Sequence, residues 1–271
     1  MKWVVPGPVF LFCPADRPDR FAKAAAVSDV VILDLEDGVA PERRPAARDA
    51  VRAATLSPEA TIVRINPVGT TDHILDLEAI RASAFSRVML AKTSSADEVR
   101  SLAPLEVVAL CETPRGVQAS EEIAGCINTI AVMWGSEDLV AAIGGSSSRT
   151  ADGALGDLAR YARAKILVDS GVHNVGALDT VFLDFGDLDG LRREASDASA
   201  MGFVGTPCIH PNQVEVVRNA YRPSDTQVDF AKEVLAAAKV QGGVFRLGDV
   251  MVDGPVIAQA RQILKRVGED G

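Results

Sequence analysis

Two acidic residues follow apolar segments of the chain, and their type suits a divalent cation. Glu112 ends the segment Glu106-Val-Val-Ala-Leu-Cys-Glu, and Asp138 follows Ala131-Val-Met-Trp134 after Gly135, Ser136 and Glu137. Apolar runs of this length bounded by Gly or Pro predict buried strands. Acids at the carboxyl ends of neighbouring parallel strands can converge, and Mg²⁺ prefers such oxygen ligands. The pair predicts a Mg²⁺ site; the alternative is that each is a solvated or Arg-paired surface acid.

Arg64 is a charged residue within the otherwise apolar segment Thr61–Asn66. A buried guanidinium must be paired, because an unpaired buried charge is costly. It can clamp a ligand carboxylate with two hydrogen bonds, or pair with Glu36 or Asp37 at the end of the preceding apolar segment. Both roles can hold together. We therefore expect Arg64 to bind substrate and Glu36 to orient it; the alternative for Glu36 is a solvated acidic loop.

Three basic residues near the N-terminus, Arg17, Arg20 and Lys23, are spaced by three. This spacing predicts one basic face on a helix over residues 16–26. Such a face favours a phosphate-bearing ligand, although a row of charges is usually only a solvated face. His210 is a candidate general base, but a structural hydrogen-bonding role is the more common one for a histidine at a strand end.

Composition excludes several classes of protein. The net charge of −9 over 271 residues argues against a nucleic-acid surface, which needs clustered Lys and Arg. No apolar run approaches the roughly 20 residues that span a bilayer, and residues 1–8 lack the apolar region of a signal peptide. Four cysteines without CxxC spacing indicate reduced core residues and a cytoplasmic protein. Phosphate-loop and nucleophile-elbow motifs are absent from the sequence.

Apolar and helical segments alternate along most of the chain. Strands are expected at 9–13, 29–38, 61–66, 87–92, 106–112, 131–134, 180–184 and 205–211. Helices are expected at 16–26, 45–54, 72–82, 95–102, 117–124, 157–170 and 188–201. Eight such repeats predict a (β/α)₈ TIM barrel, with a doubly wound open sheet as the alternative.

The C-terminal residues predict an extension that the barrel does not need. We expect the barrel to cover residues 1–222 and the extension residues 223–271. The extension reads as a helix over 224–239, a β-hairpin over 244–252 and a helix over 255–267. Because an isolated hairpin is marginally stable in water, we expect this helix-hairpin-helix extension to pack on a neighbouring subunit.

With these residues identified, the chain resembles the citrate lyase β-subunit-like branch of the HpcH/HpaI aldolase family. The matching segments cover nearly the whole chain and are together highly specific. They are LFCPADRPDRFAKA (11–24), VVILDLEDGVAPERRPAAR (30–48), TIVRIN (61–66), VMLAK (88–92), CETPRG (111–116), MWGSEDL (133–139), IGGSSSRT (143–150), CIHPNQ (208–213) and MVDGP (251–255). One departure is Ala91, where the family more often has Pro before the lysine.

The resemblance implies a Mg²⁺-dependent barrel, usually a homotrimer. Its reaction is the reversible cleavage of a 3-hydroxyacyl-CoA, such as citramalyl-CoA, malyl-CoA or citryl-CoA, into an acyl-CoA (acetyl-CoA) and a 2-keto acid. Two alternatives stay open among enzymes: a citrate lyase β subunit that works with partner subunits, and a metal-dependent keto-acid aldolase without CoA. A binding or regulatory subunit is the non-enzymatic alternative.

The resemblance also implies roles for individual residues. Glu112 and Asp138 would bind Mg²⁺, and Arg64, supported by Glu36, would hold the keto acid. Asp253 would act as acid or base in the site of a neighbouring subunit. The remaining implied contacts are Gly135, Ser136 and Glu112 with the substrate, and Arg17, Arg20, Lys23, Ile209, His210 and Pro211 with CoA.

Overall fold

The computed structural model describes residues 3–269, so the first two residues of the N-terminal segment lie outside it. The chain forms two compact units, one ending at Val217 and the other beginning at Arg218. The division falls inside a helix, a few residues before the boundary at 222 that the sequence suggests. No helix in the described part of the chain is long and apolar enough to cross a membrane.

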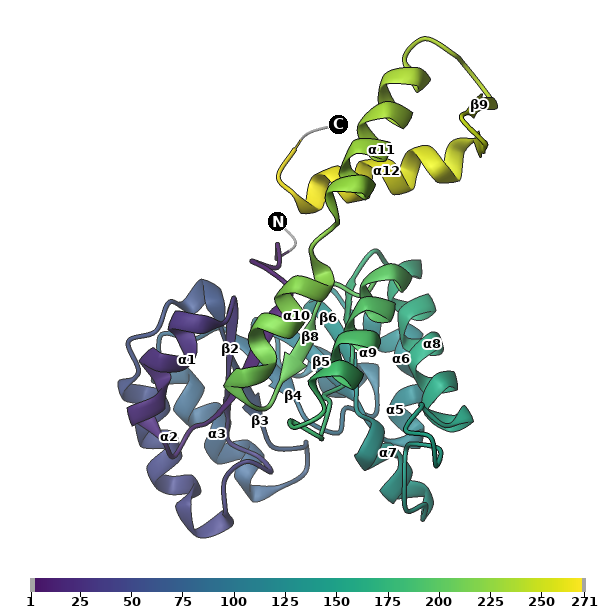
Figure 1. Cartoon of the computed structure of the whole chain (residues 1–271). Helices are drawn as coiled ribbons and strands as arrows, with labels where there is room; N and C mark the ends of the chain where they lie inside the picture. Colours follow the sequence, from purple (N-terminus) through teal and green to yellow (C-terminus); the bar gives the residue numbers. More distant parts are fainter. Residues whose placement is uncertain (1–2, 270–271) are drawn as a thin grey trace. The chain divides into compact units, whose positions relative to one another are not determined.

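Eight parallel strands form the first unit, with helices around them (Figure 1). The strands are β1 (Val9–Pro14), β2 (Val30–Asp34), β3 (Thr61–Ile65), β4 (Arg87–Leu90), β5 (Glu106–Cys111), β6 (Thr129–Trp134), β7 (Gly176–Leu178) and β8 (Thr206–Cys208). Their order is β7-β6-β5-β4-β3-β2-β1-β8, and a single parallel bridge between Leu178 and Gly205 joins the two ends. The predicted (β/α)₈ TIM barrel is confirmed.

The barrel interior is filled by side chains from successive strands. Phe10, Ile32, Ile62, Met89 and Leu110 belong to this cluster and are almost completely buried. All five residues of β2 are buried, as expected of a parallel strand that has helices on one face and the barrel interior on the other. The barrel is therefore closed by packing, and its ligands must bind at one end rather than within it.

The helices of the first unit follow the strands in turn. They are α1 (Phe21–Val27), α2 (Arg44–Ala53), α3 (Thr71–Arg81), α4 (Ala96–Arg100), α5 (Pro114–Gln118), α6 (Ser120–Ala124), α7 (Ser136–Ile143), α8 (Asp157–Val172), α9 (Leu188–Met201) and α10 (Val214–Tyr221). Several begin with a side-chain cap: Thr70 bonds the backbone N–H of His73, and Thr113 that of Gly116. These caps fix where the chain leaves the strand ends that form the site.

The seventh strand is not where the sequence places it. The expected strand over 180–184 is irregular, and β7 lies at Gly176–Leu178 instead. The apolar residues of the expected strand serve the pocket: Val181 and Leu183 line it, and Leu183 is 52% exposed. The true strand has only three residues, Gly176, Ala177 and Leu178, so it is too short to stand out as an apolar run in the sequence.

Two helix predictions also need correction. The helix expected over 16–26 begins only at Phe21, after a 3₁₀ turn at Pro18–Arg20, so Arg17 is not on it. Helix α10 was not predicted, although Val214, Val217 and Tyr221 are buried at helical spacing. The eighth strand, expected over 205–211, ends at Cys208, and Pro211 starts a 3₁₀ turn that leads into α10.

The second unit consists of α11 (Asp225–Ala238), the hairpin β9 (Phe245–Leu247) and β10 (Val250–Val252), and α12 (Gly254–Arg266). The helix-hairpin-helix order follows the sequence prediction. Ala231, Val234, Phe245, Val252 and Leu264 form its own small apolar core. The hairpin is thus packed on the two helices of its own unit.

Candidate active site

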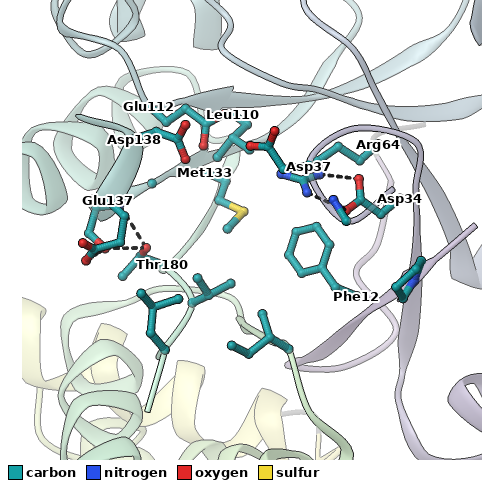
Figure 2. Close-up of a pocket in the computed structure, with 17 residues that line it drawn as sticks. Phe12, Asp34, Asp37, Arg64, Leu110, Glu112, Met133, Glu137, Asp138 and Thr180 are labelled. Atoms are coloured by element: carbon teal, nitrogen blue, oxygen red, sulfur yellow. Dashed lines mark hydrogen bonds and ion pairs between the residues drawn. The ribbon is translucent and has the colours of Figure 1, made fainter. Parts of the chain in front are cut away.

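A pocket of about 360 Å³ opens at the carboxyl ends of the barrel strands (Figure 2). Its lining divides into an acidic part and an apolar part. The polar residues are Asp34, Asp37, Arg64, Glu112, Ser136, Glu137, Asp138 and Thr180, and the apolar ones include Phe12, Leu110, Met133, Val181, Leu183 and Ile209. Barrel enzymes bind their substrates at this end. The pocket is therefore the candidate active site.

Glu112 and Asp138, predicted as a pair, lie side by side on one wall of the pocket (Figure 2). The register explains this: Cys111 pairs with Trp134, so Glu112 follows β5 at the level where Gly135 follows β6. Glu112 is buried, and its Oε1 accepts a hydrogen bond of 3.0 Å from the backbone N–H of Lys92. Burial, followed by the negative charge of Asp138, raises the pKa of Glu112 to about 8.

These two carboxylates suit a divalent cation. A buried carboxylate beside a second negative charge is unfavourable unless a cation neutralises it, and the raised pKa of Glu112 reflects first its burial and then the charge of Asp138. No group of three or more His, Cys, Asp or Glu side chains with metal-binding geometry occurs in residues 3–269. Two carboxylates with water and substrate oxygens are, however, the usual ligand set of Mg²⁺. The site therefore fits Mg²⁺ and not a metal that needs a complete protein cage.

Glycine at position 135 gives Glu112 its space. A Cβ on Gly135 would lie 2.6 Å from Glu112 Oε2 and 2.8 Å from Glu112 Cβ, which is closer than real contacts allow. The side chain of Glu112, after β5, thus lies directly against the backbone of Gly135, after β6. Glu112 can hold its position only because residue 135 has no side chain.

We expect Gly135→Ala to weaken Mg²⁺ binding at least tenfold, because Glu112 must move or the strand ends must separate. Isothermal titration of the apo protein with Mg²⁺ measures this. Gly171→Ala is the matched control: nothing lies within 4 Å of the added Cβ, and alanine in a helix should add about 0.5–1 kcal/mol of stability. Unchanged Mg²⁺ affinity in Gly135→Ala would contradict the role given to this glycine.

Arg64 lies across the pocket from the acidic pair, where it bonds Asp34 (Figure 2). A second carboxylate, that of Glu36, also holds it. Its Nε and Nη2 donate to Asp34 at 2.7 and 2.5 Å, and its Nη1 lies 2.9 Å from Glu36 Oε2. Asp34 and Arg64 are register partners on β2 and β3. The expected support by Glu36 is present, whereas the bidentate partner is Asp34, which the sequence reasoning did not assign.

Lys92 is a site residue that the sequence reasoning missed. Its Nζ bonds Glu36 Oε1 and lies 3.2 Å from Asp37 Oδ2 and 3.4 Å from Asp138 Oδ1. Burial lowers the pKa of Lys92, but the hydrogen bond that its ammonium group donates to Glu36 and the charges of the surrounding carboxylates outweigh burial and raise that pKa. The sequence feature that could have identified Lys92 is its place two residues after the apolar strand β4, at the same end of the sheet as Glu112.

The loop after β7 supports the other side of the pocket. Thr180 Oγ1 accepts a hydrogen bond of 3.2 Å from the backbone N–H of Ser136. Its neighbour Asp179 accepts from Trp134 Nε1 at 2.8 Å and is paired with the buried Arg163 at 2.8 Å. These bonds tie the residues before and after Gly135 to α8 and β7. Gly135 and Ser136, predicted to bind substrate, both line the pocket.

The residues expected to border CoA lie partly at the pocket. Ile209 lines it and is 37% exposed, and the exposed His210 ring stacks on Phe185 at 5.1 Å. The Nδ1 atom of His210 contacts the side chain of Asn212, and His210 caps the 3₁₀ turn that starts at Pro211. These contacts of His210 are structural. Arg20 and Lys23 are exposed, while Arg17 is paired with Asp19.

Asp253, the predicted acid or base, belongs to the second unit. Its side chain accepts a hydrogen bond of 3.3 Å from the backbone N–H of Val256 and so caps α12. The residue is half-buried. The ion pairs described within its unit join Lys232 to Glu269 and Arg246 to Asp249, and neither includes Asp253.

The fold and this pocket define a barrel enzyme whose paired carboxylates fit a cation, and comparisons with known proteins show its family. Residues 9–211 match the family HpcH/HpaI aldolase/citrate lyase, and residues 157–269 match the C-C bond lyases of the TIM-barrel fold. A citrate lyase subunit beta-like protein of Mycobacterium tuberculosis is 54% identical, with 97% of this chain and 96% of the relative covered. Human mitochondrial citramalyl-CoA lyase is 30% identical, with 95% and 84% covered.

A solved structure is equally similar. The crystal structure of CitE from M. tuberculosis in complex with magnesium, acetoacetate and coenzyme A is 54% identical and superposes with a TM-score of 0.94, covering 97% of this chain and 99% of that one. The chain belongs to the HpcH/HpaI aldolase/citrate lyase family. It is a carbon–carbon lyase, as the sequence resemblance implies.

Proposed function

We propose that the protein is a Mg²⁺-dependent lyase that cleaves 3-hydroxyacyl-CoA thioesters whose hydroxy-acid part carries one free carboxylate, such as citramalyl-CoA or malyl-CoA. The observation that carries the proposal is the pocket itself: Glu112 and Asp138 face Arg64 across it. Mg²⁺ and CoA are ligands of the 54% identical CitE, and citramalyl-CoA lyase is the human relative.

In this reaction the hydroxyl of the substrate loses its proton and becomes the keto oxygen. The bond between the hydroxyl-bearing carbon and the carbon next to the thioester breaks, and its electron pair forms the thioester enolate. A proton added to that enolate carbon gives acetyl-CoA, so a citramalyl group yields pyruvate and acetyl-CoA. In reverse, the same steps condense the two products.

Glu112 and Asp138 would hold the metal ion, which supplies Lewis acidity and a template for the substrate oxygens. Arg64 would bind the free carboxylate: two of its N–H groups bond Asp34 and another faces Glu36, which leaves the others for a ligand. Gly135 and Ser136, whose backbone is fixed by Thr180, would lie against the keto-acid part. Rigid placement of these groups is what such catalysis requires.

The charges of the lining favour a substrate with a single carboxylate. Five lining residues are acids and one is a guanidinium, so the negative charges exceed the positive ones even after Mg²⁺ adds its two. Near the pocket Lys92 and Glu36 offset each other. Citryl-CoA would bring a second carboxylate into this negatively charged lining, whereas the methyl group of citramalyl-CoA could contact Leu110 and Met133.

We propose further that Asp253 exchanges the proton with the enolate carbon in the site of a neighbouring subunit, within a homotrimer. The family resemblance and the position of this acid in a separate compact unit support the assignment. Arg17, Arg20 and Lys23 would border CoA at its phosphates, and Ile209, His210 and Pro211 would also border CoA. A cytoplasmic location is consistent with four buried thiols.

The test is cleavage of citramalyl-CoA, malyl-CoA and citryl-CoA by the purified chain, with Mg²⁺ and with chelator. We expect chelator-sensitive release of a keto acid from citramalyl-CoA or malyl-CoA, and at least tenfold lower kcat/KM for citryl-CoA. Preferred cleavage of citryl-CoA would contradict the charge argument. No detectable cleavage of the three thioesters, together with turnover of free hydroxy acids, would favour an aldolase that does not use CoA.

Asp253→Asn tests the shared site. Asparagine is as good a helix cap as aspartate, so the fold should persist, while kcat should fall about 10²–10⁴-fold if Asp253 transfers the proton. Co-expression of Asp253→Asn with Glu112→Gln should restore part of the activity. Some sites of the mixed oligomer then combine an intact Glu112 from one subunit with an intact Asp253 from its neighbour. Full activity of Asp253→Asn, or no restoration in the mixture, would remove Asp253 from the neighbouring site.

A further inference from the structure

Lys92 occupies an unusual position in the backbone of the site. Its φ is +53°, a left-handed conformation that residues other than glycine rarely adopt. This turn follows β4, and it lets the backbone N–H and the side chain of Lys92 point toward different parts of the site. The backbone N–H donates to Glu112 at 3.0 Å, and the side chain returns over the acids that follow β2.

The ammonium group lies among three carboxylates from two parts of the pocket. It bonds Glu36, lies 3.2 Å from Asp37, and lies 3.4 Å from Asp138 across the site. Its side chain is 31% exposed, so these contacts are only partly screened by water. Asp138 is therefore shared between a fixed cation of the protein and any metal ion that the same carboxylate binds.

We propose that Lys92 is a positioning residue that sets the affinity of the site for Mg²⁺: its backbone holds Glu112 in place, while its ammonium competes with the metal for Asp138. The inference rests on the proposed Mg²⁺ site. Competition keeps metal binding moderate. The contact between Lys92 and Glu36 places the same positive charge beside a carboxylate that supports Arg64. The two halves of the pocket are thereby linked through one side chain.

Removing the charge while keeping the backbone N–H separates the two roles. Lys92→Met should bind Mg²⁺ about tenfold more tightly, because a positive charge close to a divalent ion is lost. The kcat of this variant should fall, because Glu36 and Asp37 lose a cationic partner. Glu36, which supports Arg64, is then no longer held in place. Tighter metal binding together with slower turnover is a result that simple loss of folding cannot give.

Isothermal titration with Mg²⁺ alone, on the full-length apo protein, is the measurement. Lys92→Gly is the second uncharged variant, since glycine suits the left-handed backbone and keeps the N–H to Glu112. Lys239→Met, an exposed position in the second unit, controls for the change in net charge and should bind Mg²⁺ like the wild type. An unchanged or weaker affinity in both Lys92 variants overturns the inference. If the wild type itself binds no Mg²⁺, the proposed function fails with it.

Discussion

Replacing Glu112 by Gln should abolish Mg²⁺ binding and lyase activity, and it should make the metal-free protein more stable at pH 8. Glu112 is one of the two proposed protein ligands of the metal, and neutral Gln cannot replace a carboxylate for a hard cation. In the metal-free protein the same change removes a buried acid that is unfavourable when ionised. Gln still accepts the hydrogen bond from the backbone of Lys92.

The pH dependence follows from the raised pKa of Glu112, about 8 against 4.5 for an ordinary glutamate. Between these values the folded protein keeps a proton that the unfolded chain has released. Metal-free stability therefore falls as the pH rises from about 4.5 to 8 and levels off above. Glu112→Gln lacks this contribution, and at pH 8 it should gain on the order of 2–4 kcal/mol.

Mg²⁺ binding has the opposite dependence, because the metal must displace the proton of Glu112. The apparent affinity should weaken about tenfold for each pH unit below 8. Thermal unfolding of both proteins in chelator at pH 6 and pH 8, and Mg²⁺ titrations of the wild type over the same range, measure the two effects. Equal melting temperatures of variant and wild type at pH 8 would show that Glu112 is ionised there without penalty.

The sequence predicts this site well where a residue's place in a strand determines its position. Glu112 follows β5, Arg64 is in β3, and parallel strands bring their carboxyl ends together. The alternation of apolar and helical segments was therefore enough to predict the barrel and the convergence of Glu112 with Asp138.

The sequence fails where position depends on a turn or on tertiary contacts. The left-handed backbone at Lys92 cannot be read from a lysine, and it is this turn that returns the side chain to Glu36. Similarly, Val181 and Leu183 have the pattern of a strand but line a pocket, because Asp179 is fixed by Trp134 and Arg163. Local propensity could not reveal that fixed point.

Arg64→Met should lower kcat/KM by about 10²–10³-fold and destabilise the protein by about 3–5 kcal/mol. The loss of activity follows from the lost anchor for the substrate carboxylate. The loss of stability follows from Asp34, which is buried with Arg64 as its ionic partner, whereas Glu36 retains Lys92. Backbone N–H groups of Glu36 and Gly38 still bond Asp34 but carry no full charge.

The double variant Arg64→Met with Asp34→Asn separates the two effects. It removes the unpaired charge, so much of the stability should return, while activity stays lost because no guanidinium faces the substrate. Urea unfolding and steady-state kinetics on the single and double variants are the measurements. Recovery of activity with stability would mean that Arg64 serves only to neutralise Asp34, and the substrate carboxylate would then need another partner in the pocket.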